Sequence, residues 1–249
     1  SKGLHVLQPE KLKSDEFHEQ LKSLNADIQV VVAFRMLPEK IWDMPRLGTF
    51  NLHASLLPNY RGAAPINWAV MNGEKETGCT TFFLKHEIDT GDVLDRLVEP
   101  ILTGDNVGDL YVRLMTKGAV LVADSLDKIE SGDYSLLPQT LTGQEKHAPK
   151  IFKEDCEIDW SKTSEQIHNK VRGLSPYPGA FTQLDGQVLK VYSSEIVTEE
   201  SIDTPVFSDG KKTLLYKTAD GVLSVKTLQL QGKKRMNVED FLRGYKLKS

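Results

Sequence analysis

Residues 49–58 read Thr49-Phe-Asn-Leu-His-Ala-Ser-Leu-Leu-Pro58, and this stretch decides the fold. Gly48 precedes it, and its β-branched and aromatic residues are typical of a strand. Asn51 and His53 are two residues apart, so their side chains point to the same side of that strand. Open α/β sheets bind ligands at the carboxyl ends of their strands. The stretch therefore predicts a strand that presents polar side chains at such an edge.

Strand and helix signals alternate on both sides of this strand. A β-branched run at Ile28–Ala33 predicts a strand buried on both faces. Ser14 is a predicted helix cap, Pro65 is a predicted first helical residue, and a long helix is predicted from Asn106 to Ser131-Gly132. Further strands are predicted at 77–84 and 93–101. The alternation indicates an α/β, Rossmann-like domain with a mostly parallel sheet over residues 1–135.

The pattern changes after residue 135. Residues 136–155 lose periodicity and are interpreted as a linker. One helix is predicted at Thr163–Gly173, followed by short strands separated by Asp-Gly pairs at 185–186, 209–210 and 220–221. Residues 156–249 are therefore predicted to form a small OB-like antiparallel β-barrel domain.

Composition excludes several classes of protein. The 249 residues carry a net charge of −4 and no apolar run near the roughly 20 residues of a membrane-spanning helix. The cysteines Cys79 and Cys156 lie far apart, which argues against a disulfide scaffold or a zinc module. We expect a soluble protein of a reducing, cytoplasmic compartment. Residues 1–149 have a net charge of −6 and residues 150–249 of +2.

Asn51, His53 and Asp89 form the candidate catalytic set. A carboxamide beside an imidazole can hold a developing oxyanion and move a proton. Asp89, in Glu87-Ile-Asp-Thr-Gly-Asp92, could fix the tautomer of His53 and favour its charged form. The alternatives remain open at this point, because a single strand histidine is more often structural and Asp-Thr-Gly-Asp is also an ordinary turn.

Several further runs accompany this set. They are Tyr60-Arg-Gly-Ala-Ala-Pro-Ile-Asn-Trp68, Thr77-Gly78, Ala148-Pro-Lys-Ile151, Ile158-Asp-Trp-Ser161, Arg172-Gly-Leu-Ser-Pro-Tyr-Pro-Gly179, Gln231-Gly-Lys-Lys-Arg-Met236 and Asp240-Phe-Leu-Arg-Gly244. Together with residues 50–58 and 88–92, they resemble the folate-dependent formyltransferase family nearly end to end. The later runs resemble its branch that acts on initiator tRNA.

The resemblance implies transfer of a formyl group from 10-formyltetrahydrofolate to an amine, without metal, with Asn51, His53 and Asp89 as catalytic residues. It implies a folate-binding region formed by two segments. Its residues are Phe34, Arg35, Met36, Leu37, Ser55, Leu56, Leu57 and Pro58. Met36 and Leu37 are also open to interpretation as core residues, and Ser55 is interpreted as a loop-shaping residue rather than a nucleophile.

The resemblance also implies contact with the methionine-bearing initiator tRNA. We expect the protein to act as a monomer. The candidate RNA-binding residues are Arg61, Lys211, Lys212, Lys233, Lys234 and Arg235. Any lysine pair here is also compatible with an ordinary solvated surface. Two alternatives are a formyltransferase for a nucleotide sugar or other small amine, and a noncatalytic RNA-binding protein.

The start of the chain differs from the family pattern. Ser1 is not methionine, and the opening strand and early Gly-Thr-Pro loop of the family have no counterpart before Leu7. The resemblance therefore predicts that an N-terminal part is missing and that apolar sheet surface is left uncovered.

Overall fold

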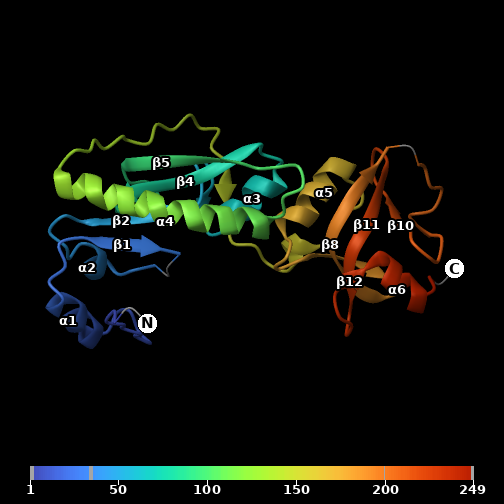
Figure 1. Ribbon diagram of the computed structural model, residues 1–249, viewed down its shortest axis with the longest axis horizontal. Helices are drawn as coiled ribbons and strands as arrows, with labels where there is room; N and C mark the ends of the chain where they lie inside the picture. The colour runs from blue at the N-terminus through green and yellow to red at the C-terminus, as the bar shows by residue number, and fades with distance from the viewer. Residues whose placement is uncertain (1–2, 34–35, 199, 248–249) are drawn as a thin grey trace.

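The computed structural model describes residues 3–33, 36–198 and 200–247. Figure 1 shows two halves side by side, with the N-terminal half around the long helix α4 on the left and the C-terminal half on the right. The first half contains a sheet with helices, and the second is mainly antiparallel strands.

The N-terminal sheet has four strands. In sheet order they are β1 (Gln29–Val32), β2 (Thr49–His53), β4 (Glu76–Phe83) and β5 (Val93–Pro100). β1 and β2 are parallel, whereas β2 with β4 and β4 with β5 are antiparallel. The described sheet is thus mixed rather than mostly parallel. The connection from β4 to β5, residues 84–92, is too short for the crossover that a parallel pair requires.

Strand β1 differs from its expected burial. Val30 and Val32 are 37% and 51% exposed, whereas the run of valines predicts burial on both faces. β1 is the end strand of the sheet, and no described element covers this face of it. Apolar sheet surface is therefore exposed at β1.

The described helices of this half are α1 (Asp15–Ser23), α2 (Glu39–Trp42), α3 (Pro65–Met71) and α4 (Val107–Ser131). The predicted starts at Ser14, Pro65 and Asn106 and the predicted end at Gly132 agree with these helices, whereas α2 was not predicted. The Ser14 hydroxyl accepts a hydrogen bond from the Phe17 amide, and Asn106 forms a reciprocal capping box with Asp109. Gly132 ends α4 in the left-handed conformation, with φ of 72°.

Helix α4 covers one face of the sheet. Leu110, Leu114 and Leu121 lie in a buried cluster against which Leu52 of β2 packs. Gly118 permits this close approach, because a Cβ there would lie 3.0 Å from Leu52 Cδ2. Since side chains alternate along a strand, Asn51 and His53 point to the face opposite α4.

The described residues of the C-terminal half form a six-stranded antiparallel sheet and two α-helices. In chain order these are α5 (Ser164–Gly173), β7 (Ala180–Leu184), β8 (Gln187–Val197), β9 (Val206–Ser208), β10 (Leu214–Lys217), β11 (Val222–Leu230), β12 (Met236–Asn237) and α6 (Val238–Gly244). The sheet order is β7-β8-β11-β10-β9, with β12 beside β11. The predicted Asp-Gly pairs fall between β7 and β8, β9 and β10, and β10 and β11. α5 and α6 bury Val171 and Phe241 in the core of this half.

The segment between the halves lies on the N-terminal half. After α4 the chain runs back beside β5 toward the C-terminal half, and Leu137 bridges to Val93 (Figure 1). Two short strands, β3 (Arg61–Gly62) and β6 (His147–Ala148), then pair in parallel. A 3₁₀ turn at Glu154–Cys156 leads into α5.

Direct hydrogen bonds also join the two halves. Asn67 Nδ2 donates to the Gly173 carbonyl at 2.8 Å, and an Arg172 guanidinium nitrogen donates to the Asp105 carbonyl at 3.2 Å. The Gly108 amide donates to the Ser175 carbonyl. The C-terminal half is therefore anchored to the helices that flank the N-terminal sheet.

Candidate active site

His53 is the last residue of β2 and is buried, with 8% of its surface exposed. Its Nε2 lies 2.8 Å from the carbonyl oxygen of Tyr60, within hydrogen-bond distance. Its Nδ1 lies 3.8 Å from Oδ2 of Asp89, which is an ion-pair distance but longer than a hydrogen bond. Each ring nitrogen therefore faces an oxygen, and the orientation of the ring is defined.

Asp89 is brought to His53 by the turn between β4 and β5. Its backbone has a φ of 56°, in the left-handed region that a non-glycine residue adopts at a cost of about 1 kcal/mol. Oδ2 accepts a hydrogen bond from the Gly62 amide at 3.0 Å, and the side chain is only 12% exposed. The structure thus confirms the expected proximity of His53 and Asp89.

Asn51 lies on β2 between Val31 of β1 and Phe82 of β4. It is half-buried, and no residue of the described ranges hydrogen-bonds to its carboxamide. Its carboxamide lies on the face of β2 that it shares with His53.

Hydrogen bonds with Thr80 of β4 fix the loop that follows β2. The Thr80 hydroxyl donates to the Ser55 carbonyl at 2.7 Å and accepts from the Leu57 amide at 3.2 Å. The Ser55 hydroxyl donates to the Asn59 carbonyl at 2.7 Å, and both Ser55 and Leu57 are buried. The interpretation of Ser55 as a loop-shaping residue agrees with this bonding.

The other predicted folate-binding segment follows β1. Phe34 and Arg35 lie outside the described residues. Met36 is 78% exposed, whereas Leu37 packs against the buried cluster of Leu12, Phe17 and Ile41. Leu37 is therefore a core residue, which is one of the two roles that its sequence pattern leaves open. Met36 is not a core residue.

Arg61 lies beside the Asp89 turn. Its Nε and Nη2 donate to Oε1 of Gln139 at 3.2 and 2.6 Å. Gln139 also donates through Nε2 to the carbonyls of Asp89 and Gly91. Gln139 was not predicted, since residues 136–155 have no periodicity, and nothing in their composition indicates a contact with the turn.

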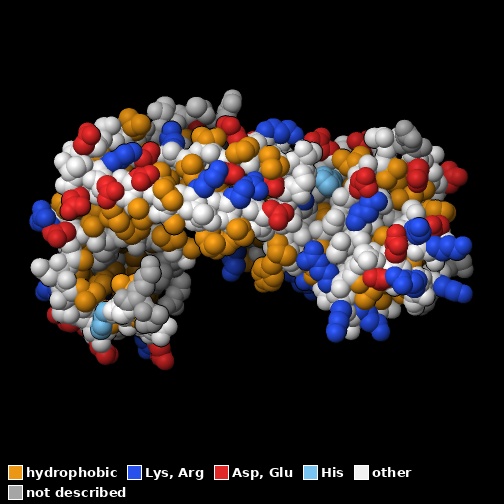
Figure 2. Space-filling model, in the orientation of Figure 1, with side chains coloured by type: hydrophobic (Ala, Val, Ile, Leu, Met, Phe, Trp, Pro, Cys, Tyr) orange, Lys and Arg blue, Asp and Glu red, His pale blue; other side chains and the backbone are white. Residues whose placement is uncertain are grey.

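The other candidate RNA-binding residues lie on the C-terminal half, where Figure 2 shows many Lys and Arg side chains among acidic ones. Lys211 and Lys212 are exposed on a turn held by Asp209, whose carboxylate accepts backbone N–H groups of Lys211, Thr213 and Lys212. These hydrogen bonds lower the pKa of Asp209 to about 2. Lys233 and Lys234 are exposed, and the Arg235 guanidinium lies 4.1 Å from the ring centroid of Tyr192.

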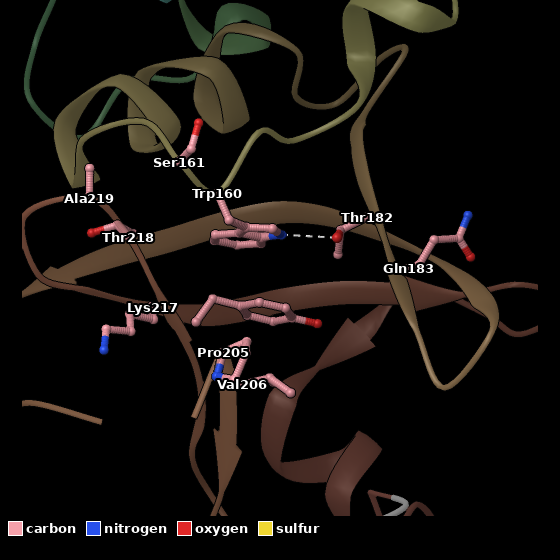
Figure 3. A pocket seen from close by; sticks show the side chains of 10 residues that line it. Trp160, Ser161, Thr182, Gln183, Pro205, Val206, Lys217, Thr218 and Ala219 are labelled. Atoms are coloured by element: carbon pink, nitrogen blue, oxygen red, sulfur yellow. Dashed lines mark hydrogen bonds between the residues drawn. The ribbon is translucent and has the colours of Figure 1, made fainter. Parts of the chain in front are cut away.

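A shallow depression of about 590 Å³ lies on the C-terminal half (Figure 3). Its wall is the indole of Trp160, which stacks on Tyr216 at a centroid distance of 4.1 Å and donates to Thr182 Oγ1 at 2.9 Å. The Trp160 and Tyr216 rings are in face-to-face contact, so no space for a planar ligand exists between them. None of its lining residues belongs to the candidate active site.

Two family models match the chain. A formyl transferase model matches residues 2–126, and a formyl transferase C-terminal domain model matches residues 150–246. A methionyl-tRNA formyltransferase of Bacteroides fragilis is 50% identical over 98% of this chain and 78% of its own length. The chain belongs to the methionyl-tRNA formyltransferase family. The described mixed sheet and the antiparallel C-terminal sheet are thus a formyltransferase N-terminal domain and its C-terminal domain.

Other relatives agree with this assignment. A methionyl-tRNA formyltransferase of Parabacteroides distasonis is 52% identical, over 99% of this chain and 79% of its own length. A methionyl-tRNA formyltransferase of Phocaeicola vulgatus is 56% identical, over 89% of this chain and 72% of its own length. The resemblance to formyltransferases is therefore confirmed, and so is its tRNA-acting branch.

Solved structures share the fold at lower identity. HypX from Aquifex aeolicus in complex with tetrahydrofolic acid is 21% identical with a TM-score of 0.68, over 94% of this chain and 42% of HypX. WlaRD, a sugar 3N-formyl transferase, is 23% identical with a TM-score of 0.65, over 82% of this chain and 73% of its own length.

The described residues contain neither a candidate membrane span nor a candidate metal cluster. No helix among them is long and apolar enough to cross a membrane. No group of three or more His, Cys, Asp or Glu side chains among them is placed to hold a metal ion.

Proposed function

We propose that this chain transfers a formyl group from 10-formyltetrahydrofolate to the α-amino group of methionine on initiator tRNA. The observation that carries the proposal is the placement of His53. Its ring lies between Asp89 and the Tyr60 carbonyl, at the end of the strand that also presents Asn51. This set occurs in a chain half-identical to methionyl-tRNA formyltransferases.

Asn51 is proposed to stabilise the oxyanion. The folate donor supplies a formyl carbon, whose oxygen gains negative charge as the amine attacks. The Asn51 carboxamide has no described partner, so its N–H groups can donate to that oxygen. One such donor typically stabilises the transition state by about 3 kcal/mol.

His53 is proposed to share the oxyanion and to move the proton. The bond between the formyl carbon and the folate nitrogen breaks as the new C–N bond forms, so the amine must lose a proton and the departing nitrogen must gain one. A histidine can carry this proton between them. Nε2 faces the Tyr60 carbonyl, so Nδ1, which forms no hydrogen bond with a described residue, is the nitrogen proposed to do so. Asp89 holds a negative charge 3.8 Å from Nδ1, which favours the cationic ring while the proton is on it.

The folate is proposed to bind beside this set, against the loop of residues 55–58 and the segment of residues 34–37. Because Ser55 and Leu57 are buried, that loop would contribute backbone groups, with Leu56 and Pro58 as its less buried side chains. The exposed Met36 would supply an apolar wall. We propose that this carboxamide, imidazole and carboxylate carry out the acyl transfer without a metal ion.

We propose that the C-terminal domain is OB-like and that it binds the tRNA. Lys211, Lys212, Lys233 and Lys234 are exposed, and exposed cations on a small β domain suit phosphate contact. Arg61 is a weaker candidate, since its guanidinium is bound to Gln139. Two described free cysteines, both buried, suit a reducing cytoplasm. We propose that the protein acts there as a monomer.

Formyl transfer to a small amine is the competing function. The same catalytic set would serve it, and WlaRD shares the fold. The test is to supply 10-formyltetrahydrofolate with methionyl initiator tRNA, and in parallel with an amino-sugar nucleotide. We expect formyl-methionyl-tRNA only, with binding to the charged tRNA that weakens as salt increases. A product on the sugar alone would overturn the proposal.

A further inference from the structure

Both ends of the Gln139 carboxamide form hydrogen bonds. Nε2 donates to the Asp89 carbonyl at 2.9 Å and to the Gly91 carbonyl at 2.8 Å. Oε1 accepts from Nε and Nη2 of Arg61 at 3.2 and 2.6 Å. The partners settle which end is oxygen, because carbonyls only accept and a guanidinium only donates.

Two of these bonds hold the turn that carries Asp89. The Asp89 backbone is in the left-handed region, so its conformation persists only where surrounding contacts enforce it. The carbonyl held by Gln139 and the carboxylate facing His53 belong to the same residue. A backbone rotation that released the carbonyl would therefore also displace Oδ2 from Nδ1.

The same segment of the chain fixes the other side of His53. The Lys146 carbonyl accepts a hydrogen bond from the Tyr60 amide. Strand β6 pairs with β3 so that Ala148 lies opposite Gly62. Tyr60 supplies the oxygen at Nε2, and Gly62 supplies the amide at Asp89 Oδ2. Both oxygens that face the imidazole are thus positioned by contacts of Gln139, Lys146 and Ala148, on the segment that leads into the C-terminal domain.

We propose that Gln139 is a positioning residue for formyl transfer, acting through Asp89 on the orientation of His53. This role rests on the proposed function. The hydrogen bonds of the Gln139 side chain go to Arg61 and to the backbone of Asp89 and Gly91. Its carboxamide holds the turn and Arg61 in one arrangement, and in that arrangement the Asp89 carboxylate faces the ring.

The test is Gln139→Glu, which keeps the size of the side chain and the acceptor for Arg61. It removes both N–H donors and places carboxylate oxygens against the carbonyls of Asp89 and Gly91, so the turn must shift. We expect kcat to fall roughly 10- to 100-fold, the range that a small misplacement of a catalytic group produces. KM for methionyl-tRNA should stay within about twofold, because the C-terminal domain is untouched. Gln144→Glu, on the same segment and exposed, adds the same charge and should leave kcat unchanged.

A second readout needs no turnover. The ¹⁵N chemical shifts of the His53 ring report its protonation and hydrogen bonding, and the signal is assigned by its loss in His53→Ala. Gln139→Glu should move these shifts, and Gln144→Glu should not. A variant with a lower melting temperature but native kcat and native ring shifts would show a merely structural role and overturn the proposal. If the unmodified chain fails to formylate methionyl-tRNA, the proposed function fails, while the ring shifts still decide the role of Gln139.

Discussion

The Oδ2 atom of Asp89 lies 3.8 Å from Nδ1 of His53, and the Gly62 amide holds that oxygen in place. The pair comes from opposite ends of an antiparallel pairing, since His53 ends β2 and Asp89 lies on the turn that follows β4. Because 3.8 Å is too long for a hydrogen bond, Asp89 acts on the imidazole ring through its charge.

Asp89→Asn tests that charge. The amide oxygen can still accept from Gly62, so the turn should keep its shape, but the imidazole loses its facing negative charge. We expect kcat to fall by at least about 100-fold, the lower range of general acid–base contributions. Asp92→Asn on the same turn removes an exposed pairing with Lys85 and should change kcat little. Equal effects of the two variants on kcat would contradict the role of Asp89.

Gly62→Ala tests the contact between the catalytic loop and the segment after α4. Gly62 has a φ of 124°, and a Cβ there would lie 2.4 Å from the Ala148 carbonyl oxygen. We expect the free energy of unfolding to fall by about 3 kcal/mol from strain and overpacking together. Gly143→Ala is the control, because its φ is also positive at 80° but nothing lies within 4 Å. Its cost should be only about 1 kcal/mol in chemical denaturation, and equal costs would refute the steric argument.

Arg113→Met tests a buried ion-pair network under α4. Arg113 pairs with Glu99 at 2.7 Å and with Asp105 at 2.6 Å, and both carboxylates are buried. Removal of one partner of a buried pair costs about 3–5 kcal/mol of unfolding free energy. Lys128→Met, which breaks the more exposed pair with Asp95 on the same helix, should cost under about 1 kcal/mol.

The network also predicts a pH dependence of stability. Burial alone raises the pKa of Glu99, but Lys117 and Arg113 hold it below its ordinary value of 4.5. The Arg113 hydrogen bond likewise lowers the pKa of Asp105 below 3.8. Lowered carboxyl pKa values stabilise the fold above the unfolded values, and that stability is lost as pH falls through the folded ones. Unfolding free energy should therefore fall below about pH 5 in the native chain and fall less steeply in Arg113→Met.

The basic residues of the C-terminal domain predict salt-dependent RNA binding. Replacement of Lys233, Lys234 and Arg235 by alanine should weaken binding of methionyl initiator tRNA at low salt. The slope of log K against log salt should become shallower by roughly one unit for each phosphate contact that is lost. Lys40→Ala, Lys85→Ala and Lys128→Ala in the N-terminal domain, made as a triple control at solvent-accessible ion pairs, should leave the slope unchanged. An identical slope in the two triple variants would exclude the C-terminal cluster as an RNA contact.

Local signals in the sequence predicted most of the helices. Ser14, Asn106 and Gly132 cap helices as their side chains or backbone freedom require, and these effects act over a single turn. The side that Asn51 and His53 share also follows from strand periodicity alone. The pairing of Asp89 with His53 was a candidate from residue types alone and was favoured by the family resemblance, because their nearness depends on a tertiary contact.

Other features depend on pairings that the sequence does not encode locally. The composition of the runs that become β4 and β5 does not distinguish a parallel pairing from an antiparallel one. The short connection between them makes the pairing antiparallel. The exposure of Val30 and Val32 depends on what packs against β1, not on β1 itself. Gln139 was missed for the same reason, since its contacts are about fifty and eighty residues away along the chain.

The most direct measurement is formyl transfer by the native chain and by His53→Ala, with 10-formyltetrahydrofolate and methionyl initiator tRNA at saturation. We expect the native chain to produce formyl-methionyl-tRNA and the variant to lose at least about 100-fold in kcat. Affinity for the tRNA should stay within about twofold, because His53 is buried away from the basic residues of the C-terminal domain. Formyl transfer by His53→Ala at the native rate would contradict the catalytic role of this residue.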